Sequence, residues 1–84
     1  MDQAPEILDL TGLKCPLPAL YARRWLERAM PGQRVIVLAD DPLAVVDVPH
    51  MCHQEGYCME TISREGACAR MVLLRPELNP PTSA

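Results

Sequence analysis

The segment from Gly12 to Pro18 places one cysteine, Cys15, between a lysine and two prolines. It lies where an apolar stretch gives way to a helical pattern, so the thiol would face the unbonded amides and the positive dipole end of a helix. Those amides and the charge of Lys14 would stabilise a thiolate, and we expect the pKa of Cys15 to lie below its ordinary value. Pro16 and Pro18 stiffen the turn and orient the sulfur. The pattern predicts a nucleophile or a sulfur acceptor.

A plainer interpretation of the same segment is that Cys15 only begins the helix and does no chemistry. A cysteine beside a single proline would favour that interpretation, whereas prolines at both ends of the first turn leave the two open. The chain has four cysteines, but none lies within two or three residues of Cys15. A thioredoxin-type pair of thiols is therefore not indicated.

The other three cysteines favour structural roles. Cys52 falls on the apolar face of a predicted helix, where a thiol is a small buried filler. Cys58 and Cys68 fall on opposite strands of a predicted hairpin. They lie at unequal distances from its turn, so they should not face each other across the strands, and Cys68 should lie opposite residue 63. A second sulfur-accepting or resolving thiol is the alternative for whichever of these is exposed.

A metal or redox sensor is a further alternative, built on His50, Cys52, His53 and Cys58. Their order and spacing match no common zinc site, and His50 would point away from Cys52 on a helix. We therefore expect no bound metal and no cofactor.

The elements that must position Cys15 follow from hydrophobic periodicity and from turn residues. Strands are expected over residues 7–10, 34–39, 57–64 and 67–75, and helices over residues 16–30 and about 42–55. An Asp of the Asp40-Asp41 pair would cap the second helix with Pro42 at its first position, and Pro49 should kink or divide that helix. The order βαβαββ predicts an α+β fold, a two-layer α/β sandwich with two helices on one face of a four-stranded mixed sheet.

Length and composition limit the classes of protein to which this chain can belong. The chain has 84 residues and 49% hydrophobic residues, which predicts a single domain over 1–84, ordered over about 6–75, with a disordered tail at 76–84. A net charge of −3 argues against direct nucleic-acid binding through bulk positive charge. No apolar run is long enough to span a membrane and the first residues resemble no signal peptide, so we expect a cytoplasmic protein with reduced thiols and no membrane partner.

The first helix also carries a candidate surface for a partner. Tyr21 and Trp25 are four residues apart and lie off its apolar stripe, and Arg24 and Arg28 add positive charge nearby. Aromatic and arginine side chains on a half-exposed face are typical of interfaces. The alternative is that the aromatics only cover the edge of the sheet.

Several segments of the chain resemble the TusA/SirA family of sulfur-carrier proteins over about residues 7–75. They are DLTGLKCPLP at 9–18, DDPLA at 40–44, DVP at 47–49, then Cys52 and Gly56-Tyr57. The resemblance implies the same βαβαββ sandwich and a sulfur carried as a persulfide on the cysteine of the CPxP motif, here Cys15. It implies supporting roles for the turn residues and the acidic pair: Gly12, Lys14, Pro16, Pro18, Asp40 and Asp41.

The resemblance also implies partners of two kinds. A cysteine desulfurase or rhodanese-like donor supplies the sulfur, and an acceptor protein takes it on, for example toward 2-thiouridine in tRNA, molybdenum cofactor or sulfur oxidation. The chain departs from the family at three places. Thr11 stands where the family often has arginine, and Met51 stands where it often has an aromatic residue. The first helix carries arginines and aromatic residues where the family usually has lysines. A non-catalytic interaction or regulatory module is the competing hypothesis.

Overall fold

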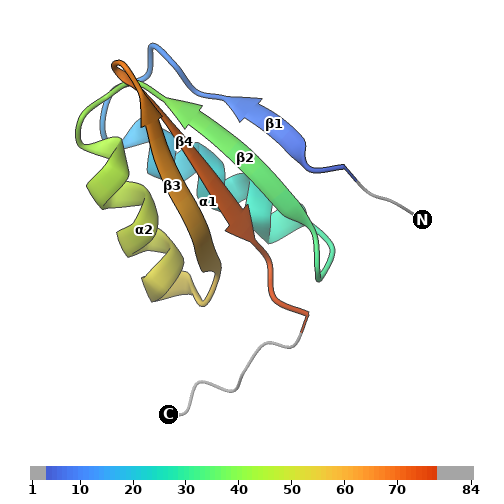
Figure 1. Cartoon of the computed structure of the whole chain (residues 1–84). Helices are drawn as coiled ribbons and strands as arrows, with labels where there is room; N and C mark the ends of the chain where they lie inside the picture. The colour runs from blue at the N-terminus through green and yellow to red at the C-terminus, as the bar shows by residue number, and fades with distance from the viewer. Residues whose placement is uncertain (1–3, 78–84) are drawn as a thin grey trace.

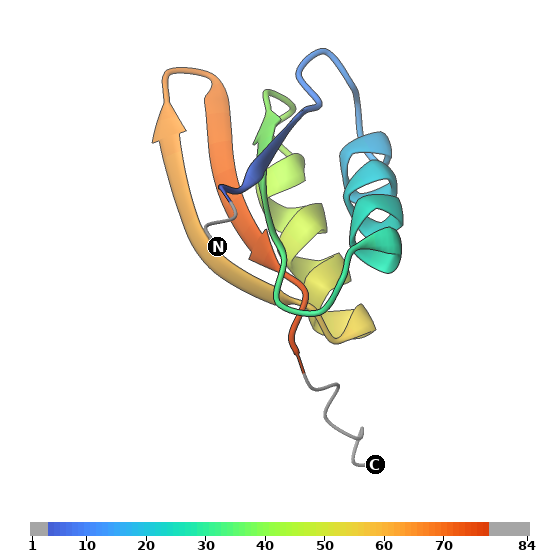
Figure 2. The ribbon, with the colours of Figure 1, turned by 90° about the vertical axis from the view of Figure 1, so that its right-hand side faces the viewer.

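The computed structural model describes residues 4–77. Its elements are β1 (Glu6–Asp9), α1 (Leu17–Arg28), β2 (Arg34–Ala39), α2 (Ala44–Glu55), β3 (Cys58–Glu65) and β4 (Cys68–Leu74). The four strands form one sheet in the order β1-β2-β4-β3, with β1 parallel to β2 and the other neighbours antiparallel. Both helices lie on one side of this sheet (Figures 1 and 2). The predicted two-layer sandwich is confirmed. Most of the predicted tail, from residue 78, lies outside the described residues.

The core fills the space between the helices and the sheet. Strand β2 is central and four of its six residues are buried, as its continuous aliphatic sequence predicts. Alternate residues of β4 reach the same layer, and each helix contributes a buried stripe. The largest fully buried side chains are apolar: Pro18, Leu26, Val35, Val37, Val48, Cys52, Met71 and Leu73. The burial of Cys52 confirms that it is a core filler.

Helix α1 is shorter than the sequence pattern predicts at both ends, and helix α2 is shorter only at its start. Helix α1 begins at Leu17, after Pro16 in the N-cap position, and ends at Arg28. Helix α2 begins at Ala44 with Leu43 as N-cap and no side-chain cap, so the prediction of an aspartate cap followed by Pro42 is wrong. The aspartates are engaged elsewhere. Pro49 lies inside α2 and does not divide it.

The hairpin of β3 and β4 turns through two residues, Gly66 and Ala67. Glu65 pairs with Cys68, and Cys58 pairs with Leu74. Cys58 and Cys68 are therefore not cross-strand partners, as predicted, although Cys68 faces Glu65 and not residue 63. The difference arises because the positive φ of Gly66, 63°, sets a tight turn directly after Glu65.

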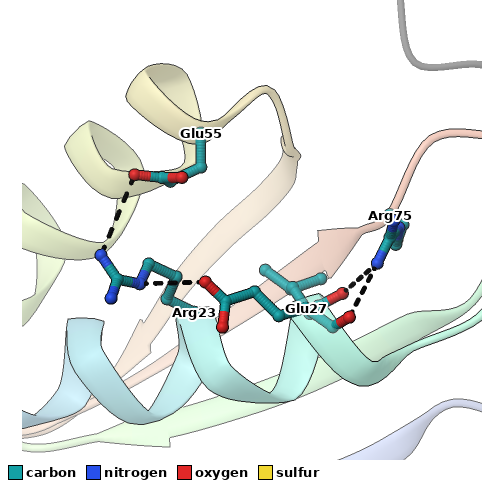
Figure 3. A network of polar contacts seen from close by, with 5 residues as sticks. Arg23, Glu27, Glu55 and Arg75 are labelled. Carbon is teal, nitrogen blue, oxygen red and sulfur yellow. Dashed lines mark hydrogen bonds and ion pairs between the residues drawn. The ribbon is translucent and has the colours of Figure 1, made fainter.

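Arg75, just beyond β4, ties the end of α1 to the sheet. Its guanidinium donates hydrogen bonds to the carbonyls of Leu26, Glu27 and Ala29 at 2.9, 3.0 and 3.2 Å. Carbonyls at the end of a helix have few backbone amides to bond, and Arg75 supplies a donor to three of them. On the same helix Arg23 lies 3.3 Å from Glu27 and 4.0 Å from Glu55 of α2 (Figure 3). Polar contacts thus join α1 both to β4 and to α2.

Within the part of the chain that the structure describes, neither helix has the length and apolar content to cross a membrane.

Candidate functional site

Cys15 lies in the loop between β1 and α1, with its thiol exposed. The Cys15–Pro16 peptide bond is cis. The amide of Leu17 donates to the carbonyl of Lys14 at 2.8 Å, and Pro16 and Pro18 have no amide hydrogen. The first turn of the helix therefore has few amides left to face the sulfur.

Two aspartates that follow β2 hold this loop by its backbone. Asp40 accepts a hydrogen bond from the amide of Gly12 at 2.9 Å, and Asp41 accepts one from the amide of Cys15. The second oxygen of Asp41 accepts from the amide of Leu43 at 3.3 Å. The parallel pairing of β1 and β2 brings the ends of both strands to one edge of the sheet, which is why residues 26 and 28 positions apart meet. The acidic pair fastens the cysteine loop to the start of α2.

Gly12 is the position where this loop needs glycine. Its φ is +87°, a conformation that side-chain-bearing residues rarely adopt. A Cβ atom here would meet nothing within 4 Å, so the requirement comes from backbone conformation and not from crowding. Asp9, which precedes the turn, also supports it: its carboxylate accepts hydrogen bonds from the amide and the hydroxyl of Thr11 at 3.1 and 2.7 Å.

Asp47, in the first turn of α2, is the side chain that meets the sulfur. The Cys15 thiol donates a hydrogen bond to its carboxylate. Sequence reasoning did not single out Asp47 as a site residue, although it opens the DVP segment at 47–49. Its place in the first turn of the helix that follows Asp40 and Asp41 could have indicated that it lies near the cysteine loop.

The acidic surroundings reverse the expected pKa shift of Cys15. The hydrogen bond to Asp47 comes first among the causes that raise its pKa above the ordinary value, followed by desolvation and by the charges of Asp47 and Asp41. A carboxylate that accepts the thiol proton stabilises the protonated form. The prediction of a lowered pKa is wrong, because it counted the helix end and Lys14 but not carboxylates that arrive from a distant segment.

The starts of α1 and α2, which flank the cysteine loop, both carry exposed apolar side chains. Leu17 opens α1, Leu43 precedes α2, and Val46 stands beside Asp47 in the sequence. Exposed groups of this kind around a reactive atom are typical of surfaces that contact another protein.

The four residues predicted to face a partner line one groove. It has a volume of about 590 Å³ and lies between α1 and β1. Tyr21, Arg24, Trp25 and Arg28 form its α1 side, and Glu6, Leu8 and Leu10 form its strand side. Trp25 also packs against the core, so one part of its ring is structural.

The residues of the alternative metal site do not converge. Cys52 is buried, whereas His50, His53 and Cys58 are exposed. Among residues 4–77 no group of three His, Cys, Asp or Glu side chains is arranged to hold a metal ion. Burial raises the pKa of Cys52 to about 11, which makes it an unreactive thiol.

Comparisons with known proteins agree with this geometry. The family model described as sulfurtransferase TusA matches residues 6–74. Two proteins from Neisseria meningitidis serogroups A and B, provisionally named sulfur carrier proteins, are each 38% identical over 68 residues, 81% of this chain and 92% of theirs. The crystal structure of a SirA-like protein from Desulfitobacterium hafniense superposes with a TM-score of 0.72 at 25% identity, covering 84% of this chain and 97% of that one. The chain belongs to the TusA family of sulfurtransferases.

Proposed function

We propose that this protein carries sulfane sulfur as a persulfide on Cys15. The observation that carries the proposal is the site itself: an exposed thiol on a loop held by two carboxylates, with its proton already directed at a third. A cysteine that merely began the helix would need no such arrangement. Family membership supports the same chemistry.

The transfer is an exchange between two sulfur centres. The Cys15 sulfur attacks the terminal sulfur of a donor persulfide, R–S–SH, as the Cys15 proton passes to Asp47. A sulfur–sulfur bond forms at Cys15 while the donor's sulfur–sulfur bond breaks, and the donor leaves as a thiolate that takes the proton back from Asp47. The products are Cys15–S–SH and R–SH, so no oxidant or reductant is consumed. Delivery to an acceptor thiol repeats the exchange in the opposite sense.

Each supporting residue has a distinct part in the proposal. Asp40 and Asp41 hold the loop through the amides of Gly12 and Cys15, and Gly12 permits its turn. Pro16 and Pro18 restrict the backbone on the helix side of the sulfur. Lys14 is exposed beside Cys15 and would offset the negative charge that develops on sulfur.

The partners of the proposal are proteins. The Cys15 thiol is exposed on a loop, which suits a sulfur that arrives on another protein, either a cysteine desulfurase or a rhodanese-like donor. An acceptor protein, in tRNA thiolation or another sulfur pathway, would then receive it. A cytoplasmic location, where thiols stay reduced, fits this role.

The experiment is sulfur loading followed by intact-mass measurement. Incubated with a cysteine desulfurase and cysteine without reductant, the protein should gain one sulfur atom, and peptide mapping should place it on Cys15. The Cys15→Ser variant should gain none. Cys58→Ser is the matched control, since Cys58 is also an exposed thiol, and it should load like the unaltered protein. Sulfur uptake by Cys15→Ser would show that Cys15 is not the carrier residue, whereas no uptake by the unaltered protein would support the non-catalytic interaction module.

A further inference from the structure

The groove between α1 and β1 is separate from the cysteine loop but shares its helix. Its strand side comes from Glu6, Leu8 and Leu10, alternate positions that point toward the helix layer. Its other side is the face of α1 that carries Tyr21, Arg24, Trp25 and Arg28. With a rise of about 1.5 Å per residue, these helix positions begin about 6 Å from the start of α1 and extend for about 10 Å more. A protein bound at Cys15 could therefore reach the groove along α1.

The arginines of α1 divide into two kinds. Arg23 is engaged inside the molecule, with Glu27 on its own helix and Glu55 on α2 (Figure 3). Arg24 and Arg28 face the groove, and neither forms an ion pair within residues 4–77. Glu6 is the one acidic side chain in the lining, so the groove is locally positive in a chain whose net charge is −3. Its charge therefore favours an acidic occupant.

The floor of the groove adds an apolar requirement. Leu8 and Leu10 contribute aliphatic surface, Trp25 is half-buried, and Tyr21 remains 40% exposed. Trp, Tyr and Arg are the residue types that contribute most to protein interfaces. Strand β1 lies at an edge of the sheet, which leaves room for an extended chain beside it.

We propose that the α1–β1 groove binds an extended, acidic segment of the protein that exchanges sulfur with Cys15. Apolar side chains at alternate positions of that segment occupy the floor between Leu8 and Trp25, and its carboxylates pair with Arg24 and Arg28. The proposal rests on the carrier function and adds a second contact, which determines which proteins reach the cysteine.

The test uses two synthetic peptides of eight residues. In one, Asp and Glu alternate with Leu; in the other, Lys replaces every acidic residue. Trp25 is the only tryptophan of the chain and lines the groove, so its fluorescence reports occupancy directly. The acidic peptide should shift the emission of Trp25 saturably, more weakly at high salt, and the basic peptide should not. Equal binding of both peptides, or of neither, overturns the proposal.

Variants locate the binding and separate this proposal from the carrier function. The Arg24→Ala/Arg28→Ala pair should weaken binding of the acidic peptide at least about tenfold. Arg64→Ala/Arg70→Ala removes the same charge from the hairpin strands and should leave binding unchanged. Both pairs should still load sulfur at Cys15 from inorganic polysulfide, a donor too small to need docking. Loading without peptide binding overturns the groove proposal and leaves the carrier function standing. Peptide binding without loading overturns the carrier function, and with it the identity of the partner, but leaves the groove as a site for acidic segments.

Discussion

At the scale of single residues, the contact between Cys15 and Asp47 is the main influence on the Cys15 thiol. The carboxylate accepts a hydrogen bond from the thiol and raises the pKa of Cys15, which favours the thiol over the thiolate.

Replacing Asp47 tests this arrangement. Asp47→Asn removes the negative charge, so the pKa of Cys15 should fall and more thiolate should be present near neutral pH. Alkylation by iodoacetamide, measured against pH in a Cys58→Ser/Cys68→Ser background, should then be several-fold faster near pH 7, with the whole profile moved to lower pH. Asp9→Asn alters the carboxylate at the end of β1, which bonds Thr11 and not the sulfur, and should leave the profile in place. An unchanged profile in Asp47→Asn would show that the contact does not control the thiol.

Asp41 acts on the backbone, and its loss should therefore affect stability. Its carboxylate accepts from the amides of Cys15 and Leu43 and so joins two segments that are distant in sequence. Asp41→Ala should lower the free energy of unfolding by about 1 to 2 kcal/mol, measured by urea denaturation. Glu65→Ala, at the exposed end of the hairpin, should change it by less than about 0.5 kcal/mol. Equal stabilities of the two variants would contradict the anchoring role.

At the scale of elements, the placement of α1 matters most because both the cysteine loop and the groove depend on it. Arg75 bonds three carbonyls at the end of this helix from a position beyond β4. Arg75→Gln should destabilise the fold by about 1 to 2 kcal/mol, since the remaining amide reaches fewer of these carbonyls. Hydrogen exchange should become faster in the last turn of α1 before it does in β2. The control is Arg70→Gln on the exposed side of β4, and uniform exchange in both variants would argue against a local cap.

At the scale of the whole molecule, one ion pair gives stability a pH dependence. Arg34 of β2 bonds Glu60 of β3 at 2.7 and 3.1 Å, and the Arg34 hydrogen bond lowers the pKa of Glu60. Because the folded pKa lies below the ordinary value of 4.5, this contribution is present above that pH and is lost as pH falls through the folded pKa. The stability difference between the unaltered protein and Arg34→Gln should be small and constant near neutral pH and should shrink below about pH 4.5. A difference that grows as pH falls would reverse the assignment.

The sequence by itself determined the element order, the position of Cys15 between β1 and α1, the buried role of Cys52 and the resemblance to the TusA family. These follow from local information: the hydrophobic periods of strands and helices, turn residues such as glycine, and the CPxP motif. Only the tertiary structure decided that Asp40 and Asp41 anchor the cysteine loop and do not cap a helix, and that Cys15 has a raised pKa. Asp47 lies 32 residues from Cys15 in the chain, and electrostatic effects depend on distances that only the folded chain sets. For the same reason, the groove became visible only when β1 was placed beside the Tyr21–Arg28 face of α1.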